Sequence, residues 1–445
     1  ALPVRAQEQE TPNQTDVRQI TFNEAVRIAL KQNVALRQSA NNVEAQSISV
    51  SESRSAFLPN LFLNTQSSQN YGRSIDPTTN DFSSAVYESF TTSASSGINV
   101  FNGFGDVARL KQNRLYLDAA DTQYERQQQA VVFNVMDRYL DLLTRQEQVN
   151  IQEEALGAQQ QTLTQIEELV RVGVQPISDQ YQQQAQVAST ELALLNAQRD
   201  AQLAEVALIQ VLQLDPFGAY DFTAPSVEDL PLVEEDYDLG NLLQNAFERR
   251  SDLQAQFFTI SAAKEGLRVA RSGYFPSIDL SVGYGSRWSN NSFAGGPGPP
   301  AFFDQLDQQR GGSVGFSLGF PIFDRLQTRN SVQRAQVQYD NAQLDLQALR
   351  QNVALEVRQS YLNYLTAEKT LDVTDKQLQA ADLALEAAQE RYNVGAGTIV
   401  ELTDAQATQV RAASERVQAR YDFLFQKRLI DYYLGVLDPS QPLFE

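Results

Sequence analysis

Two stretches of the chain carry the same series of apolar residues in the same register. Within each stretch the apolar positions recur every seven residues, except for one step of four at the same place in both. The first series comprises Leu110, Leu117, Tyr124, Val131, Val135, Leu142, Val149, Leu156, Leu163 and Val170. The second lies 222 residues later and comprises Val332, Tyr339, Leu346, Val353, Val357, Tyr364, Leu371, Leu378, Leu385 and Tyr392. Steps of seven are typical of a helix along a coiled-coil seam, and a step of four locally unwinds the supercoil. The pattern therefore predicts a duplicated chain built on two very long helices.

The long helices are expected over about residues 104–172 and 324–394. At about 1.5 Å per residue, each would span on the order of 100 Å. Each is followed by a tight turn, at Val172-Gly173 and at Val394-Gly395, and then by a return helix that ends near Pro216 or Pro439. The return helix covers only half of the long helix, as far as the step of four.

A shorter helical pattern opens each half and fits the uncovered half of the long helix. The first runs over residues 21–57, with Thr21 and Glu24 in the spacing of a capping box, and the second runs over 239–275. Each helix is followed by a proline, Pro59 or Pro276.

Beyond each proline the apolar pattern changes to a period of two, which is typical of strands with one apolar face. The sequence predicts hairpins over 58–102 and 276–323, with polar, non-helical loops over about 71–89 and 289–312. The clearest apolar positions are Ile278, Leu280, Val282, Tyr284, Val314, Phe316, Leu318, Phe320 and Ile322. Trp288, Tyr284, Phe302 and Phe303 are candidates for an interfacial aromatic girdle, or for ordinary loop packing.

Four strands with one apolar face and two free edges are not stable alone in water. In lipid, every backbone amide needs a hydrogen-bond partner. Closure by several copies of the chain solves both problems. The expected fold is therefore a mixed one, with a membrane β-barrel closed by several chains and a long helical coiled-coil barrel. We expect a disordered N-terminus over residues 1–19 and a C-terminal tail over residues 439–445. Between them we expect two helix–hairpin–long helix–helix repeats, over residues 20–215 and 239–438, joined by an equatorial linker over residues 216–238.

The composition argues against several classes of function. The net charge of −20 argues against a nucleic-acid partner, and the absence of histidine and cysteine removes the commonest metal ligands, thiolate chemistry and disulfides. No apolar run of about 18 residues predicts a transmembrane helix. The first residues carry no hydrophobic signal core, so the chain is taken as mature. We expect no enzyme, no catalytic residue, no cofactor and no metal site. The alternative to a membrane channel is a soluble coiled-coil scaffold of the cell envelope.

Several motifs resemble the TolC-type outer-membrane efflux and secretion channels over nearly the whole chain. The strongest match lies at residues 392–404, where the sequence YNVGAGTIVELTD resembles the second periplasmic turn of that family. The helix–strand junctions at 56–59 and 273–276 and the strand exits at 100–103 and 321–324 also resemble the family.

The resemblance implies a homotrimer in the outer membrane, with four strands per chain closing a twelve-stranded barrel and the helices forming a periplasmic tunnel. It implies passive conduction in a tripartite efflux or type I secretion system, multidrug export included. The implied partners are a periplasmic adaptor (membrane fusion) protein, an inner-membrane transporter of the RND or ABC class, and outer-membrane lipid.

The resemblance also suggests site residues at the closed end of the tunnel. Glu401 and Asp404, one helical turn apart, match an acidic pair that forms carboxylate rings in the channel. The alternative is an exposed polar face at a helix N-terminus, where acidic residues are favoured in any case.

Two further features belong to the same end. Tyr392 matches a tyrosine that restrains the gate, and Asp179 matches its carboxylate partner, although Tyr392 is also a seam residue. Gly397 stands where the prototype has a basic residue, so part of the restraining network differs. The turn residues are candidates for adaptor docking, namely Val172, Gly173, Val394 and Gly395.

Overall fold

The chain forms two compact units, and each unit draws on both halves of the sequence. The helical unit contains residues 1–41, 121–254 and 347–445, and the sheet unit contains residues 42–120 and 255–346. This is a computed structural model, and it describes residues 17–75, 82–83, 86–223, 232, 234–290 and 301–437. The predictions for residues 1–16 and for the tail 439–445 lie outside the described residues.

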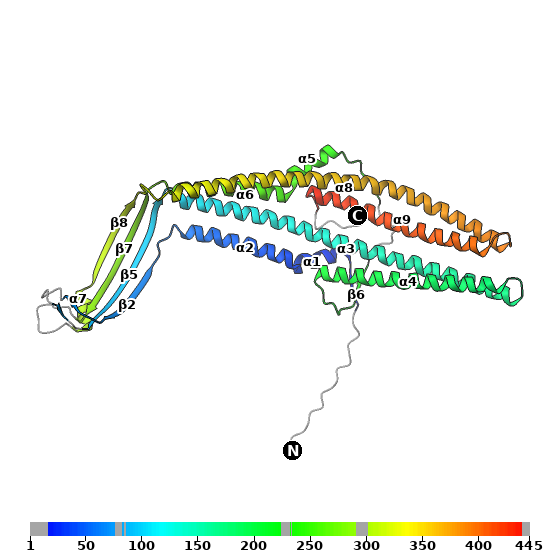
Figure 1. The fold of residues 1–445 in the computed structure, drawn as a ribbon, viewed down its shortest axis with the longest axis horizontal. Helices are drawn as coiled ribbons and strands as arrows, with labels where there is room; N and C mark the ends of the chain where they lie inside the picture. Colours follow the sequence, from blue (N-terminus) through cyan, green and yellow to red (C-terminus); the bar gives the residue numbers. More distant parts are fainter. Residues whose placement is uncertain are drawn as a thin grey trace, which may run out of the picture. The chain divides into compact units, whose positions relative to one another are not determined.

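The two long helices and their return helices are present. Helix α3 spans Gly105–Arg171 and α4 spans Ile177–Leu212, while α8 spans Gln327–Asn393 and α9 spans Ile399–Leu434. Each long helix has 67 residues and each return helix has 36. Each long helix folds back into its return helix as a hairpin (Figure 1). All four helix starts are related by the 222-residue offset of the apolar series.

The prediction of one continuous opening helix in each half is wrong. The first consists of α1 (Phe22–Gln32) and α2 (Val34–Ser55), and the second of α5 (Leu239–Arg249) and α6 (Ser251–Ser272). The single residues between them, Asn33 and Arg250, have extended ψ angles of 125° and 123°. Because both neighbours of the break remain helical, the apolar pattern alone did not reveal it.

The core of the helical unit surrounds the step of four in the apolar series. Val131, Val135, Leu208 and Leu212 are all at most 2% exposed and belong to one cluster. Tyr139 is also fully buried there, and its hydroxyl lies 3.1 Å from the carbonyl oxygen of Ile20 and 2.6 Å from that of Thr223. Burial raises the pKa of Tyr139, so the phenol remains a hydrogen-bond donor at neutral pH.

A short parallel ladder was missed in the sequence. Strand β1 (Arg18–Ile20) pairs with β6 (Tyr220–Phe222), so residues 18 and 19 are ordered, not part of a disordered N-terminus, and the linker contributes a strand. Three-residue strands are too short to show a period of two.

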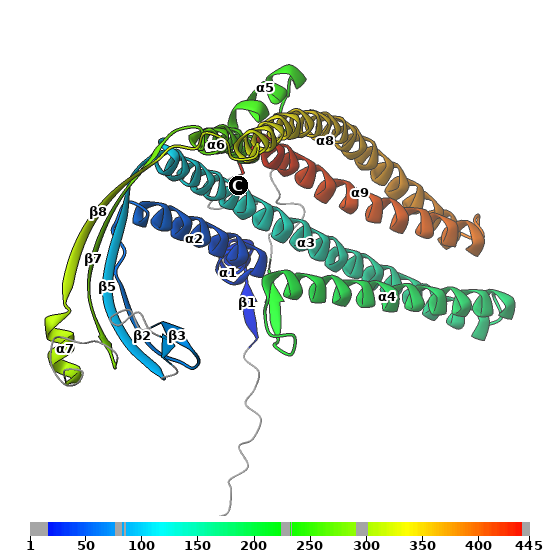
Figure 2. The same ribbon diagram turned by 60° about the vertical axis from the view of Figure 1, so that its left-hand side comes forward.

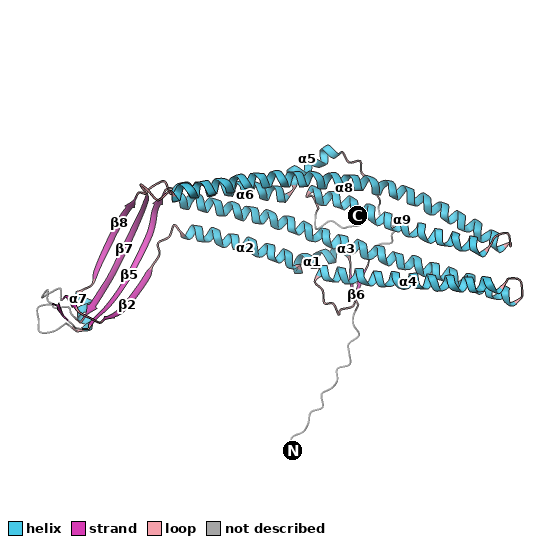
Figure 3. Ribbon diagram, in the orientation of Figure 1, coloured by secondary structure: helices cyan, strands magenta, loops and turns pink. Residues whose placement is uncertain are grey.

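In the sheet unit, four antiparallel strands form one sheet in the order β2-β5-β7-β8 (Figure 3). Their bounds are Phe62–Asn70, Tyr87–Asn102, Ser277–Ser289 and Gly311–Gly319. Strands β5 and β7 join the two hairpins, which leaves β2 and β8 at the edges. The first tip also holds a two-residue ladder of β3 (Ser74–Ile75) and β4 (Phe82–Ser83), and part of that tip lies outside the described residues.

The register of the sheet separates an apolar face from a polar face. Leu280 pairs with Ile98 on one side and Phe316 on the other, whereas Asp279 pairs with Asn99 and Ser317. Many apolar side chains on the first face are exposed, at 77% for Leu63, 46% for Val282, 57% for Tyr284, 76% for Val314, 69% for Phe316 and 64% for Leu318. A single face with this much exposed apolar surface marks an interaction site.

The loop between β7 and β8 contains a helix, contrary to the prediction of a non-helical tip. Helix α7 spans Phe302–Gln308 and follows the predicted breaker run at 295–300, which lies outside the described residues. In the described part of the chain, none of the helices contains a stretch that is both long and apolar enough to cross a membrane.

The duplication extends to the junctions where a strand passes into a long helix. Gly103 and Phe104 have positive φ angles of 65° and 64°, and Arg325 and Leu326, at the 222-residue offset, have 57° and 63°. A Cβ atom on Gly103 would lie 2.6 Å from the Ser272 oxygen, so only glycine fits that position.

Candidate functional site

The turn between α3 and α4 is held by backbone hydrogen bonds around Gly173. The Gly173 amide donates to the Val170 oxygen (3.0 Å), and the Val174 amide donates to the Leu169 oxygen (2.9 Å). Gly173 has a φ angle of 80°, which favours glycine. Val172 is 59% exposed and Val174 is 70% exposed, so the turn presents apolar side chains to its surroundings.

The turn between α8 and α9 has the same construction. Gly395 has a φ angle of 74°, and the amides of Ala396 and Gly397 both donate to the Arg391 oxygen, at 2.8 and 2.9 Å. A Cβ atom on Gly397 would lie 3.2 Å from the Arg391 Cβ, so glycine allows this close approach. Val394 is 75% exposed.

A small apolar cluster joins the two hairpins below these turns. Ile166 of α3 and Leu402 of α9 are both 0% exposed, and Ile399 is 6% exposed. Val170, Leu385, Ala388 and Tyr392 pack against them. The cluster therefore connects the ends of α3, α8 and α9 through direct side-chain contact.

The structure gives the predicted gate tyrosine a different partner. The Tyr392 hydroxyl accepts a hydrogen bond from Gln175 Nε2 at 3.0 Å, so the two turns are directly linked. The Asp179 carboxylate accepts a hydrogen bond from Ser178 Oγ at 3.2 Å. Within the described residues of this chain, Tyr392 and Asp179 are not joined. Gln175 was missed because it lies in the loop, where no helical period marks it.

The two predicted gate carboxylates lie at the start of α9, and both residues are exposed. Thr398 caps the helix by accepting a hydrogen bond from the Glu401 amide at 3.3 Å. Glu401 Oε2 also lies 3.1 Å from Arg391 Nη2. Arg391, at the end of α8, thus places a guanidinium beside the Glu401 carboxylate.

A layer of buried glutamines lies farther from the turns. Gln159, Gln183 and Gln406 are 5%, 0% and 7% exposed, and they come from α3, α4 and α9. Gln183 Nε2 donates to Gln159 Oε1 (2.6 Å), and Gln159 Nε2 donates to Gln406 Oε1 (3.1 Å). Gln159 stands three residues after the seam residue Leu156, where a coiled coil ordinarily carries an apolar side chain. This polar residue within the seam is the signal in the sequence that marks the layer.

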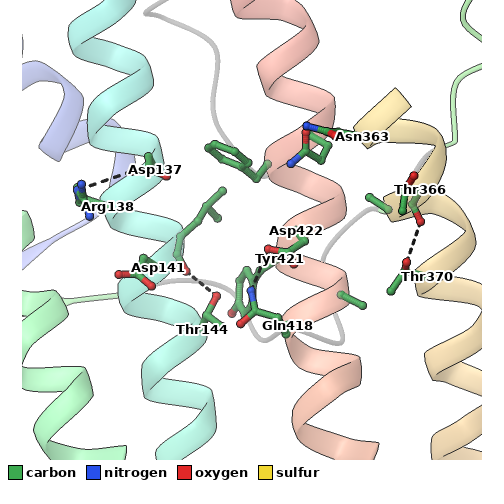
Figure 4. Close-up of a pocket in the computed structure, with 15 residues that line it drawn as sticks. Asp137, Arg138, Asp141, Thr144, Asn363, Thr366, Thr370, Gln418, Tyr421 and Asp422 are labelled. Carbon is green, nitrogen blue, oxygen red and sulfur yellow. Dashed lines mark hydrogen bonds and ion pairs between the residues drawn. The ribbon is translucent and has the colours of Figure 1, made fainter. Parts of the chain in front are cut away.

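A pocket of about 660 Å³ opens between α3, α8 and α9 in the helical unit (Figure 4). Its polar lining includes Asp137, Asp141, Gln418 and Asp422, and Gln418 Nε2 donates to Asp422 Oδ1 at 2.9 Å. Partial burial raises the pKa of Asp137 and of Asp422. No group of histidine, cysteine, aspartate or glutamate in the described ranges is arranged to hold a metal ion.

Comparisons with known proteins agree with this geometry. The family model described as "Outer membrane efflux protein" matches residues 25–212 and 242–435. The outer membrane protein TolC of Escherichia coli (strain K12) is 26% identical over 416 residues, which cover 92% of this chain and 81% of that protein.

Two solved structures have the same fold at low sequence identity. A crystal structure of CusC superposes with a TM-score of 0.80 at 18% identity and covers 98% of this chain and 97% of that chain. The CmeC outer membrane channel of Campylobacter jejuni superposes with a TM-score of 0.78 at 18% identity and covers 95% of this chain and 87% of that chain.

Proposed function

Because the chain belongs to the outer membrane efflux protein family of TolC-type channels, we propose that it is a passive conduit for export across the outer membrane. Its relatives are outer membrane efflux channels, which are not enzymes. In the proposed assembly three copies close one pore, and each copy contributes two repeats, over residues 20–215 and 239–438.

The observation that carries this proposal is the sheet with an exposed apolar face and two unpaired edges. The apolar face suits lipid, because side chains such as Leu63, Val314 and Phe316 are mostly exposed. The edges β2 and β8 suit pairing between neighbouring copies, since an open edge in lipid would leave backbone groups without partners. Three copies would supply twelve strands; the number three is taken from the family resemblance.

The helices offer matching surfaces for the same assembly. Exposed apolar residues form stripes on α8 and on α4, although both helices already pack within their own hairpins. On α8 they are Leu344, Leu355, Leu362, Val373 and Leu383, each at least 53% exposed, and on α4 they are Leu192, Leu195, Leu203 and Val206, each at least 57% exposed. Stripes of this kind are expected to be covered by neighbouring copies in a helical barrel.

We place the gate at the two turns. Glu401 and Asp404 would line the tunnel as rings of like charge. Tyr392, which bonds to Gln175 within the chain, and Asp179 would restrain the hairpins. The exposed turn residues Val172, Gly173, Val394 and Gly395 would contact a periplasmic adaptor, which connects the conduit to an inner-membrane RND or ABC transporter.

The test is reconstitution of the full chain in planar bilayers, together with its mass in detergent. We expect trimers and a conductance that prefers cations, and we expect the double variant Glu401→Gln, Asp404→Asn to reduce that preference, because the rings would lose their charge. The matched control is Glu153→Gln, Glu154→Gln, which removes two charges from an exposed face of α3. A chain that remains monomeric without detergent and forms no pore would instead support the coiled-coil scaffold.

A further inference from the structure

Helix α7 is fixed onto the apolar face of the sheet, at the end of the strands that lies away from α2 and α6 (Figure 2). Ser286 Oγ donates to the Leu306 oxygen at 2.5 Å, and the Phe302 ring lies 5.5 Å from Trp288 and 5.3 Å from Phe90. Phe90 pairs with Trp288, and Ser286 stands two residues from both Tyr284 and Trp288, so these side chains share the face of Leu280 and Val282.

A buried glutamine clamps the helix to the strand. Gln305 is 1% exposed, its Oε1 accepts a hydrogen bond from the Ser289 amide (2.6 Å), and its Nε2 donates to the Ser289 oxygen (3.2 Å). Through these two hydrogen bonds, the Gln305 side chain pairs with the backbone of β7 much as another strand would. Helix α7 is therefore held firmly within the sheet unit, and its residue Phe303 is 80% exposed.

The apolar run of β7 is short without this helix. From Ile278 to Tyr284 the strand rises about 20 Å, which corresponds to about 15 Å along the membrane normal at a tilt of about 45°. The next position on that face is Ser286, which is polar. Extension to Trp288 brings the band to about 23 Å, close to the roughly 25 Å band of outer-membrane barrels. The aromatic side chains around α7 thus fill the part of the band that the strand residues leave polar.

We propose that α7 is an interfacial lipid anchor, which lies against the outer leaflet boundary and completes the apolar band with Phe302, Phe303 and Trp288. This inference rests on the proposed function, since it assumes that the apolar face meets lipid. Aromatic residues favour the membrane interface, and Asp304 and Asp307 on the same helix suit its polar side.

The chain has one tryptophan, so the emission of Trp288 reports on this site without interference. The full-length protein is reconstituted in vesicles of phosphatidylcholine and in vesicles of the same lipid brominated near the headgroup. We expect bromine to reduce the emission about twofold, and we expect aqueous acrylamide to have little effect, because Trp288 would lie in the interface.

Two variants extend the test. Gln305→Ala should release α7 and increase quenching by acrylamide, whereas Gln308→Ala on the same helix should not. Phe303→Ser should shift the Trp288 emission of the lipid-bound protein to longer wavelength. An inserted, conducting trimer whose Trp288 responds to acrylamide but not to brominated lipid would overturn the anchor alone. A protein that neither inserts nor conducts would overturn the proposed function itself.

Discussion

At the turns, the backbone φ angle decides which residue a position accepts. Gly395 has a φ angle of 74° with open space around its Cα, so the requirement for glycine there is conformational and not steric. Gly157 lies within α3, also with open space around it. The two glycines therefore make a matched pair in which the same substitution has opposite effects.

Gly395→Ala should destabilise the chain by about 1 kcal/mol, because alanine is strained at positive φ. Gly157→Ala should stabilise it by about 0.5–1 kcal/mol, because alanine favours the helix. Chemical unfolding followed by circular dichroism measures both values. Equal effects of the two substitutions would contradict the assignment of Gly395 to a strained turn.

A pH-dependent prediction concerns Asp422 at the pocket. Since burial raises its pKa in the folded state, the charged carboxylate destabilises the fold above that pKa, and the effect fades as the pH falls and the group protonates. Asp422→Asn should therefore raise the thermal midpoint at pH 8 and change it less at pH 4. The control is Asp340→Asn, because Asp340 accepts the same kind of bond from Gln336 (2.9 Å) on an exposed helix face. A gain for Asp422→Asn that is independent of pH would argue against burial as its cause.

At the scale of elements, the glutamine layer connects the two hairpins by polar contacts inside a packed interface. Gln406→Ala would leave the Gln159 amide without its α9 partner, and we expect a loss of about 1–3 kcal/mol in unfolding free energy. Gln409→Ala is the control, since Gln409 lies on the same helix as Gln406 but donates to the exposed Asp382 of α8 (3.0 Å). In bilayers, Gln406→Ala should also raise the open fraction of the pore if the hairpins separate during opening.

The elements differ in how far the sequence could predict them. The 67-residue helices and the strands of β7 and β8 follow from sustained periods of seven and two, since a long repeat leaves little ambiguity. The breaks at Asn33 and Arg250, the β1–β6 ladder and α7 involve one to seven residues, which is too short for any period.

The site shows the same limit. The motif places Tyr392, Glu401 and Asp404 near the second turn, but it does not predict the hydrogen bond to Gln175 or the ion pair with Arg391. The hydrogen bond depends on how two segments more than 200 residues apart meet, and the ion pair depends on how the chain folds back between α8 and α9; no local period encodes either contact. The roles of the predicted site residues in a gate stay predictions.

At the scale of the whole molecule, the absence of cysteine makes the proposed closure of the sheet directly testable. Ser317 on edge strand β8 and Asn64, Gln66 or Ser68 on edge strand β2 lie on the same polar face. Ser317→Cys combined with a cysteine at each of these β2 positions in turn should, for at least one pair, give a covalent trimer under oxidising conditions on a non-reducing gel. Each single-cysteine variant serves as the control, and exclusive monomers for every pair would contradict β2–β8 pairing between copies.

The polar face of the sheet has a consequence for cargo. Its side chains are mostly small and hydroxylated, as in Ser93, Ser95, Ser281, Ser313 and Ser317, and Asp279 is hydrogen-bonded to Asn99 at 2.8 Å. In the proposed ring this face would line the exit, and the charged side chains Asp279 and Arg287, which have opposite signs, would also lie on it. Because these two charges would offset each other, the exit would select cargo mainly by its width, and a strong preference by charge would have to arise at the turns, before cargo reaches the strands.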